Sequence, residues 1–133
     1  MSGDPHRKTR VLEQIARVGK ALGNAKRLEL LDLLAHGESC VDALASSAGL
    51  GVGNTSAHLQ ILKSGGLVTT RREGTRVYYR LADQGVADVC ALLRQMAAAH
   101  LAGMAGTAAT TVAYRGQGSE ETGGGDQDRR PSP

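Results

Sequence analysis

Residues 51–68 of the chain read GVGNTSAHLQILKSGGLV, with glycines at both ends of a helical pattern. At about 100° per residue, a helix over residues 52–64 separates a core-facing side from a side of small and amide residues. The core-facing side comprises Val52, Thr55, Leu59 and Leu62; the opposite side comprises Gly53, Asn54, Ala57 and Gln60, with Ser56 and His58 beside it. A core helix carries more leucine and a solvated helix more charge. We therefore expect this helix to lie against a large polar partner.

The DNA major groove is the partner that fits these residue types. Small side chains let the helix backbone approach the groove floor, and Asn or Gln can pair bidentately with adenine. An ordinary solvated helix with weak caps is the alternative. The neighbouring segments favour DNA.

A basic hairpin follows the helix. The sequence LVTTRREGTRVYYRLAD (67–83) alternates apolar and polar residues on either side of REGT, which predicts two paired strands. Residues 54–80 hold five basic residues and one acidic residue, a net of +4 against +3 for the whole chain. This segment is thus the expected anion-facing surface. Its candidate contacts are Lys63 at the helix end and Arg71, Arg72, Thr75 and Arg76 at the hairpin tip.

The rest of the chain predicts further helices over residues 9–22, 24–37, 39–49 and 84–104, from apolar spacing, caps and terminal glycines. Asn24 is the expected cap of the second helix. Ser39, with Asp42 three residues on, resembles a capping box for the third. The fold class is mainly α with a small β-hairpin, a winged helix-turn-helix of order α-α-α-α-β-β-α.

Three regions follow from this pattern. Residues 1–8 are expected to form a flexible basic arm, and residues 9–106 the DNA-binding and dimerisation domain. Residues 107–133 are expected to be a mostly disordered tail rich in Gly, Ser and Pro, with no predicted role. The last helix carries an apolar seam at near-heptad spacing, which predicts pairing with a second copy.

Composition limits the function classes. No run of about 18 apolar residues and no signal region are present, so we expect a cytoplasmic protein without a membrane span. An enzyme is not expected, because no nucleophile constellation, paired acids or phosphate loop can be found. The Gly51-x-Gly53 pair lacks the preceding strand that a dinucleotide fold requires. Two cysteines in a reducing compartment predict no structural disulfide.

Three stretches resemble the ArsR/SmtB family of bacterial winged-helix repressors, especially the DNA-binding part of members fused to a rhodanese domain. They are LGNAKRLELLDLL (22–34), NTSAHLQILKSGGLV (54–68) and RREGTRVYYRLA (71–82), within a resemblance that covers about residues 10–104. The resemblance implies a homodimer, joined through its first and last helices, that binds an inverted repeat in double-stranded DNA and releases it to an inducer. The DNA contacts that it implies are Asn54, Thr55, Ser56, His58, Gln60, Arg71, Arg72 and Arg76. We expect no rhodanese domain in this chain.

The sensing motifs of the family are incomplete here. The family's ELCVCDL appears as ESCVDAL (38–44), which keeps Cys40 but has Asp42 in place of the second cysteine. In the last helix Asp88 matches the family motif, Cys90 replaces its first histidine, and His100 is one residue out of register. The metal site is therefore unknown, with Cys40, Asp88, Cys90 and His100 as candidates.

The two cysteines are the candidate effector sites. Cys40 follows the expected cap Ser39, where backbone amides and the helix dipole stabilise a thiolate. Cys90 lies on the apolar seam. The alternative for each is a small buried or half-buried residue without a sensing role. If both act, they would bind a soft metal or metalloid ion, or respond to an oxidant or polysulfide. No obligatory cofactor is expected.

The sequence thus predicts a dimeric transcriptional repressor released from its operator by a soft metal or thiol-reactive signal. The alternative is a winged-helix module for protein interaction, or a constitutive DNA-binding module without an inducer site.

Overall fold

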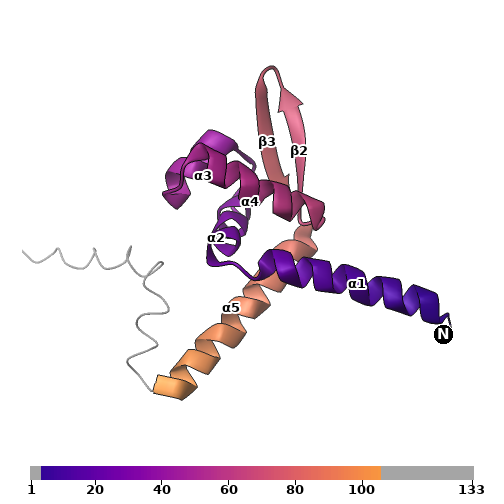
Figure 1. Ribbon diagram of the computed structural model, residues 1–133. Coiled ribbons are helices and arrows are strands. Elements are labelled where there is room, and N and C mark those ends of the chain that lie inside the picture. The colour runs from indigo at the N-terminus through magenta and orange to yellow at the C-terminus, as the bar shows by residue number, and fades with distance from the viewer. Residues whose placement is uncertain (1–3, 106–133) are drawn as a thin grey trace, which may run out of the picture. The chain divides into compact units, whose positions relative to one another are not determined.

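The helices and strands follow the predicted order, with one strand added. The computed structural model describes residues 4–105 (Figure 1). The elements are α1 (Pro5–Leu22), α2 (Ala25–Leu34), β1 (Ser39–Cys40), α3 (Val41–Ala48), α4 (Val52–Ser64), β2 (Val68–Glu73), β3 (Arg76–Leu81) and α5 (Gln84–Ala105). Asn24 caps α2 as predicted, because its side chain accepts a hydrogen bond from the Arg27 backbone N–H. The mainly α winged helix-turn-helix is confirmed.

The added strand changes the start of α3. Ser39 and Cys40 pair with Tyr79 and Tyr78, so the antiparallel sheet has the order β1-β3-β2. The prediction that Ser39 caps α3 is wrong, since Cys40 occupies the N-cap. A strand of 2 residues is too short to leave a period-two pattern in the sequence.

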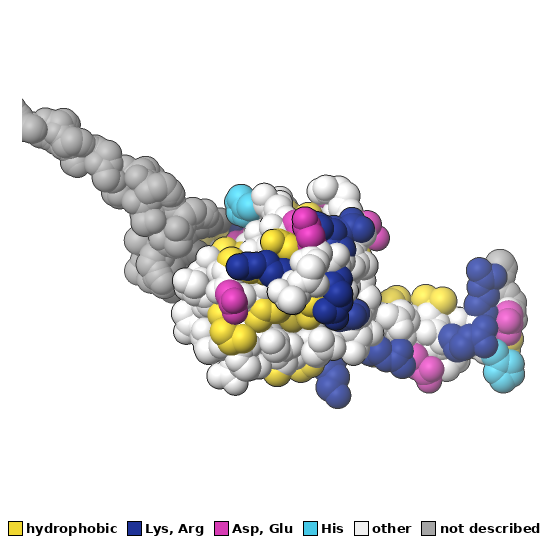
Figure 2. All heavy atoms as spheres, turned by 90° about the horizontal axis from the view of Figure 1, so that it is seen from above, with side chains coloured by type: hydrophobic (Ala, Val, Ile, Leu, Met, Phe, Trp, Pro, Cys, Tyr) yellow, Lys and Arg dark blue, Asp and Glu magenta, His cyan; other side chains and the backbone are white. Residues whose placement is uncertain are grey.

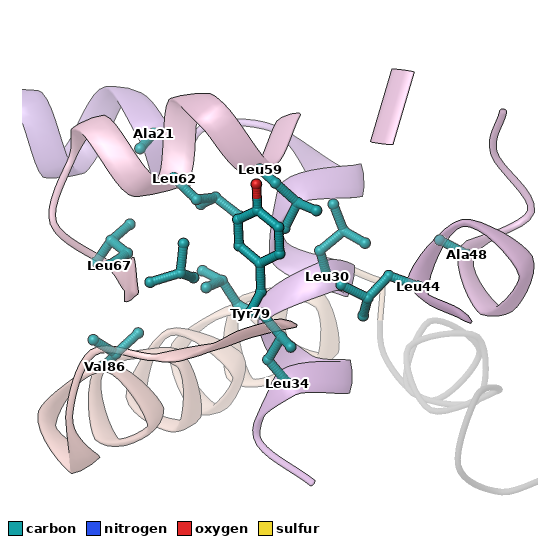
Figure 3. Close-up of a cluster of buried hydrophobic side chains, with 12 residues drawn as sticks. Ala21, Leu30, Leu34, Leu44, Ala48, Leu59, Leu62, Leu67, Tyr79 and Val86 are labelled. Atoms are coloured by element: carbon teal, nitrogen blue, oxygen red, sulfur yellow. The ribbon is translucent and has the colours of Figure 1, made fainter. Parts of the chain in front are cut away.

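The core forms around α2, which packs against α1, α3, α4 and β3. Figure 3 shows Leu30 of α2, Leu59 and Leu62 of α4, and the ring of Tyr79 gathered in one cluster. Leu31 and Leu34 are buried, as are Leu44 and Ala48 of α3. Leu30, Leu31 and Leu34 fall within about 100° around the helix axis, so α2 buries one side of itself. Because α3 and α4 both pack against α2, the core holds these two helices together.

The first helix begins earlier than the sequence predicts. Asp4 is its N-cap and accepts a hydrogen bond from the His6 N–H, with Pro5 at the first helical position. Proline is favoured there because its missing N–H is not needed. Residues 5–8, which the sequence assigned to a flexible arm, are thus the first residues of α1.

Only the C-terminal end of α1 packs on the core. Ala21 is buried and Val18 and Leu22 are half-buried, whereas Val11 and Ile15 are 51% and 58% exposed. An apolar stripe left in water by one chain is a surface available to a partner.

The last helix spans a boundary between two compact units, which lies between Cys90 and Ala91. In the first unit, Val86 is buried and Cys90 packs partly against the core. In the second, Leu92 and Met96 are exposed. Within the described residues no helix is both long and apolar enough to cross a membrane. The predicted tail over residues 107–133 lies outside the described residues.

Candidate nucleic-acid interface

Glycines fix the turn between α3 and α4. Gly49 has a φ of 68°, the left-handed conformation that ends a helix, and its N–H donates to the Ser46 carbonyl. The Leu50 N–H donates to the Ala45 carbonyl at 3.0 Å. Gly51 is then the N-cap of α4. The direction in which α4 leaves the turn is set by these backbone bonds.

The two sides of α4 are as the sequence predicts, with one exception. Thr55, Leu59 and Leu62 are buried. Val52 is 51% exposed although it was expected in the core, because the first helical residue extends past the packed centre. The opposite side is exposed at Gly53, Asn54, Ala57 and Gln60, and half-buried at Ser56 and His58.

The prediction that Thr55 contacts DNA is wrong. Its side chain is fully buried, and its hydroxyl donates to the Gly51 carbonyl at 2.9 Å. The threonine thus closes the first turn of α4 instead of facing outward. The family resemblance placed Thr55 on the recognition helix correctly, but its side chain is on the buried side of that helix and not on the side that faces outward.

Two side chains on α4 are tied to neighbouring elements. His58 Nδ1 lies 3.4 Å from Arg27 Nη1 on α2, and the Gln60 amide donates to the Tyr79 hydroxyl at 3.4 Å. Lys63, in the last turn, is exposed. Arg27 and Tyr79 were not predicted to touch this surface, and only their proximity in the fold identifies them.

The hairpin β2–β3 forms the wing. Gly74 has a φ of 66°, which permits the tight turn between Glu73 and Arg76. Tyr79 is buried in the core, while Tyr78 is on the other face of the strand. The wing is therefore anchored by Tyr79, while Tyr78 is half-buried.

Arg71 is held by side chains of its own chain. Its guanidinium donates two hydrogen bonds of 2.8 Å to the Glu38 carboxylate and one of 2.7 Å to Glu73. It also lies 4.7 Å from the ring centre of Tyr78. The Arg71 hydrogen bonds hold the pKa of Glu38 below its usual value. Sequence reasoning missed Glu38 because it lies 33 residues from its partner.

The other wing residues are more available. Arg72, Thr75 and Arg76 are exposed, and Arg72 forms no salt bridge with another described residue. Figure 2, which looks down on the hairpin, shows Lys and Arg side chains on this face with carboxylates beside them. The net positive charge predicted here is thus present at the surface but partly paired.

Cys40 lies beside the wing. Hydrogen bonding from the Ala43 backbone N–H, and then from the Arg76 side chain, lowers the pKa of the Cys40 thiol. Arg76 Nη1 is 3.6 Å from the Cys40 sulfur. Both residues, with Asp42 and Thr75, line a surface pocket of about 380 Å³. These contacts favour the thiolate form of Cys40, although Cys40 is itself the N-cap of α3 and not the residue after a Ser39 cap.

The other candidate sensing residues have surroundings of their own. Asp88 accepts a hydrogen bond from Gln84 at 3.2 Å, and Cys90 packs partly against the core. His100 is exposed in the second unit. No three His, Cys, Asp or Glu side chains within the described residues are grouped as a metal site. No disulfide joins Cys40 and Cys90.

Comparisons with known proteins agree on one type of domain. Residues 24–70 match the family described as "Bacterial regulatory protein, arsR family". The chain is 54% identical over 112 residues to the HTH-type transcriptional regulator Rv0324 of Mycobacterium tuberculosis, covering 84% of this chain but 50% of that protein. It thus spans about half the length of this relative.

Two further matches extend the comparison. A probable mercury resistance operon repressor of Streptomyces lividans is 35% identical over 89 residues, covering 67% of this chain and 71% of the repressor. The solution structure of the homodimeric winged helix-turn-helix DNA-binding domain of Mb0332 from Mycobacterium bovis is 54% identical. It superposes with a TM-score of 0.69, covering 76% of this chain and 94% of that domain.

Proposed function

The chain belongs to the ArsR family of bacterial regulatory proteins, and from this premise we propose that it is a homodimeric repressor whose α4 helices enter the DNA major groove at an inverted repeat. The outward side of α4 carries the proposal: Asn54 and Gln60 are exposed, with the small residues Gly53 and Ala57 between them around the helix, and Leu59 and Leu62 anchor the opposite side. Amides on a close-fitting helix suit base readout. The wing supplies charge for the DNA backbone.

The dimer is supported by the exposed apolar residues of α1 and α5. Val11 and Ile15 on α1, and Leu92 and Met96 on α5, are each more than half exposed. The homodimeric state of the Mb0332 domain supports the same assembly for this chain. Sedimentation at micromolar concentration is expected to give a dimer, and a monomer would remove the proposed assembly.

DNA binding is tested by titration of an inverted repeat, selected from a random pool, at several salt concentrations. Binding is expected to weaken steeply with salt, since phosphate contacts release counterions. Arg72→Ala should reduce the affinity for this DNA. Arg7→Ala, which removes the same charge from α1, is the control and should reduce it less. Salt-independent or sequence-independent binding would favour the alternative of a protein-interaction module.

We further propose that release from DNA is triggered at Cys40, with help from Cys90, by a soft metal or metalloid ion or by a thiol oxidant. The lowered pKa of Cys40 fits a thiolate ligand for a soft ion. The similarity to a probable mercury resistance repressor supports the metal reading. Because one chain groups no three ligands within its described residues, a three-coordinate site would draw ligands from the partner copy.

Cys40→Ser is the test of this trigger. The parent protein is titrated on DNA with mercuric ion and, separately, with polysulfide, and the variant should stay bound under whichever agent releases the parent. Cys90→Ser is the matched comparison and should weaken the response less. Normal release by Cys40→Ser would place the sensor elsewhere, and no release of the parent would favour constitutive binding.

A further inference from the structure

Arg27 is immobilised where α1 meets α2. Its backbone N–H donates to the Asn24 side chain at 3.0 Å. Its guanidinium donates to the carbonyls of Ala21 at 2.7 Å and Lys20 at 3.1 Å, the last turn of α1. The last carbonyls of a helix lack intrahelical partners, and Arg27 supplies donors to two of them, of which the Lys20 carbonyl also accepts from the Gly23 N–H. The side chain is half-buried, so its remaining nitrogen has a defined position.

That remaining nitrogen faces the recognition helix. Arg27 Nη1 lies 3.4 Å from Nδ1 of His58. A guanidinium has only N–H donors and stays protonated in proteins. The contact is therefore a hydrogen bond only when Nδ1 of His58 carries a lone pair. The proton of the neutral ring then belongs to Nε2, because neutral imidazole has one donor and one acceptor.

We infer that Arg27 is a positioning residue that holds His58 in the Nε2–H form, so that α4 presents an N–H donor at this position. The inference rests on the proposed function, in which α4 enters the major groove. A donor there pairs with N7 or O6 of guanine, N7 of adenine, O4 of thymine or a phosphate oxygen. It does not pair with the amino groups of cytosine or adenine. Arg27 thus helps to set the base preference without touching DNA.

A purely structural arginine would behave differently. Capping the α1 carbonyls requires only the bonds to Ala21 and Lys20, and these leave the His58 tautomer undetermined. Arg17 provides a matched control, since it lines the same surface pocket of about 420 Å³ as Arg27. It donates to Gln14 at 3.0 Å, on its own helix.

The tautomer is measured in the DNA-free protein by a two-bond ¹H–¹⁵N spectrum of labelled histidine at mildly alkaline pH. The parent and Arg17→Gln should give the Nε2–H pattern for His58. Arg27→Gln should give a mixture, because a glutamine amide can donate to Nδ1 or accept from it. An Nδ1–H pattern in the parent, or an unchanged pattern in a folded Arg27→Gln, would overturn the inference.

The readout is measured by selecting binding sites from a random DNA pool with the same proteins. Arg27→Gln should lose about 2- to 12-fold discrimination at one base position, the equivalent of one net hydrogen bond of about 0.5–1.5 kcal/mol. Arg17→Gln should keep the parent preference while losing the same charge. Should Arg27→Gln not fold, His58→Gln, which offers both a donor and an acceptor, should relax the same position.

The two measurements separate the inference from its premise. If the parent protein selects no sequence, the proposed function is wrong, and so is the part of the inference that concerns base readout. The histidine spectrum still decides which tautomer His58 adopts. A parent that selects a sequence, with Arg27→Gln selecting the same bases equally well, overturns the readout half alone.

Discussion

The recognition helix and the wing both face the proposed DNA surface, but they are built in opposite ways. On α4, the outward Asn54 is exposed and short, and burial of Leu59 and Leu62 behind it fixes its direction. On the wing, the long Arg71 is exposed, yet Glu38, Glu73 and Tyr78 already hold it. Packing behind α4 leaves Asn54 exposed, whereas Gln60 on the same side donates to the Tyr79 hydroxyl. A charged side chain on the hairpin can contact DNA freely only where it is not already paired with a carboxylate of its own chain.

The largest expected effect breaks the anchoring of α4. Leu59 is fully buried, so Leu59→Ala should lower the free energy of unfolding by about 2–5 kcal/mol, through lost burial and the cavity left behind. Ile61→Ala, on the same helix at 43% exposure, should cost much less. Urea denaturation followed by circular dichroism measures both. Equal losses would mean that α4 is not anchored from one side.

This anchoring was predictable from sequence. The spacing of Thr55, Leu59 and Leu62 gives the buried side of α4 directly, because a long periodic helix carries its own register. The pairing of Arg71 with Glu38 was not predictable, since it depends on β1, whose 2 residues leave no pattern. Contacts between distant segments require the fold. The same limit explains why the contact between Arg27 and His58 was missed.

The next effect tests the helix as the source of specificity. Asn54→Ala should relax the preference for one base pair by about 1–3 kcal/mol if its amide pairs bidentately with a base. Affinity for unrelated DNA should change little, because no charge is lost. Competition between the selected site and single-base variants of it measures this. Uniform weakening on all sequences would make Asn54 a backbone contact instead.

A smaller effect distinguishes two neighbouring wing arginines. Arg72→Ala should reduce the slope of log affinity against log salt by about 1, the loss of one phosphate contact. Arg71→Ala should leave this slope nearly unchanged, because its guanidinium is shared between two carboxylates. Binding isotherms at several salt concentrations give both slopes. If Arg71→Ala also reduces the slope by about 1, DNA phosphates displace Glu38 and Glu73 on binding.

The smallest effect concerns the thiol that lies where the wing meets α3. The pKa of Cys40 is lowered first by the Ala43 backbone N–H and also by Arg76, so Arg76→Ala should raise this pKa without restoring it fully. A thiolate is the form that reacts with iodoacetamide, and at a fixed pH below the pKa a higher pKa means less thiolate. The pH profile of Cys40 alkylation should therefore move to higher pH in Arg76→Ala.

Arg72→Ala is the control for this shift, since it removes the same charge from the same hairpin and Arg72 is not among the groups that lower the Cys40 pKa. Mass spectrometry of the Cys40 peptide gives the alkylation rate and separates it from Cys90. A profile that moves equally in both variants would assign the effect to the net charge of the wing. A shift confined to Arg76→Ala would mean that the wing lowers the Cys40 pKa through the contact with Arg76 alone. By linkage, a change at the Cys40 thiol then also affects Arg76. Whatever removes the negative charge of Cys40 then weakens its hold on Arg76, a residue that the wing would offer to DNA.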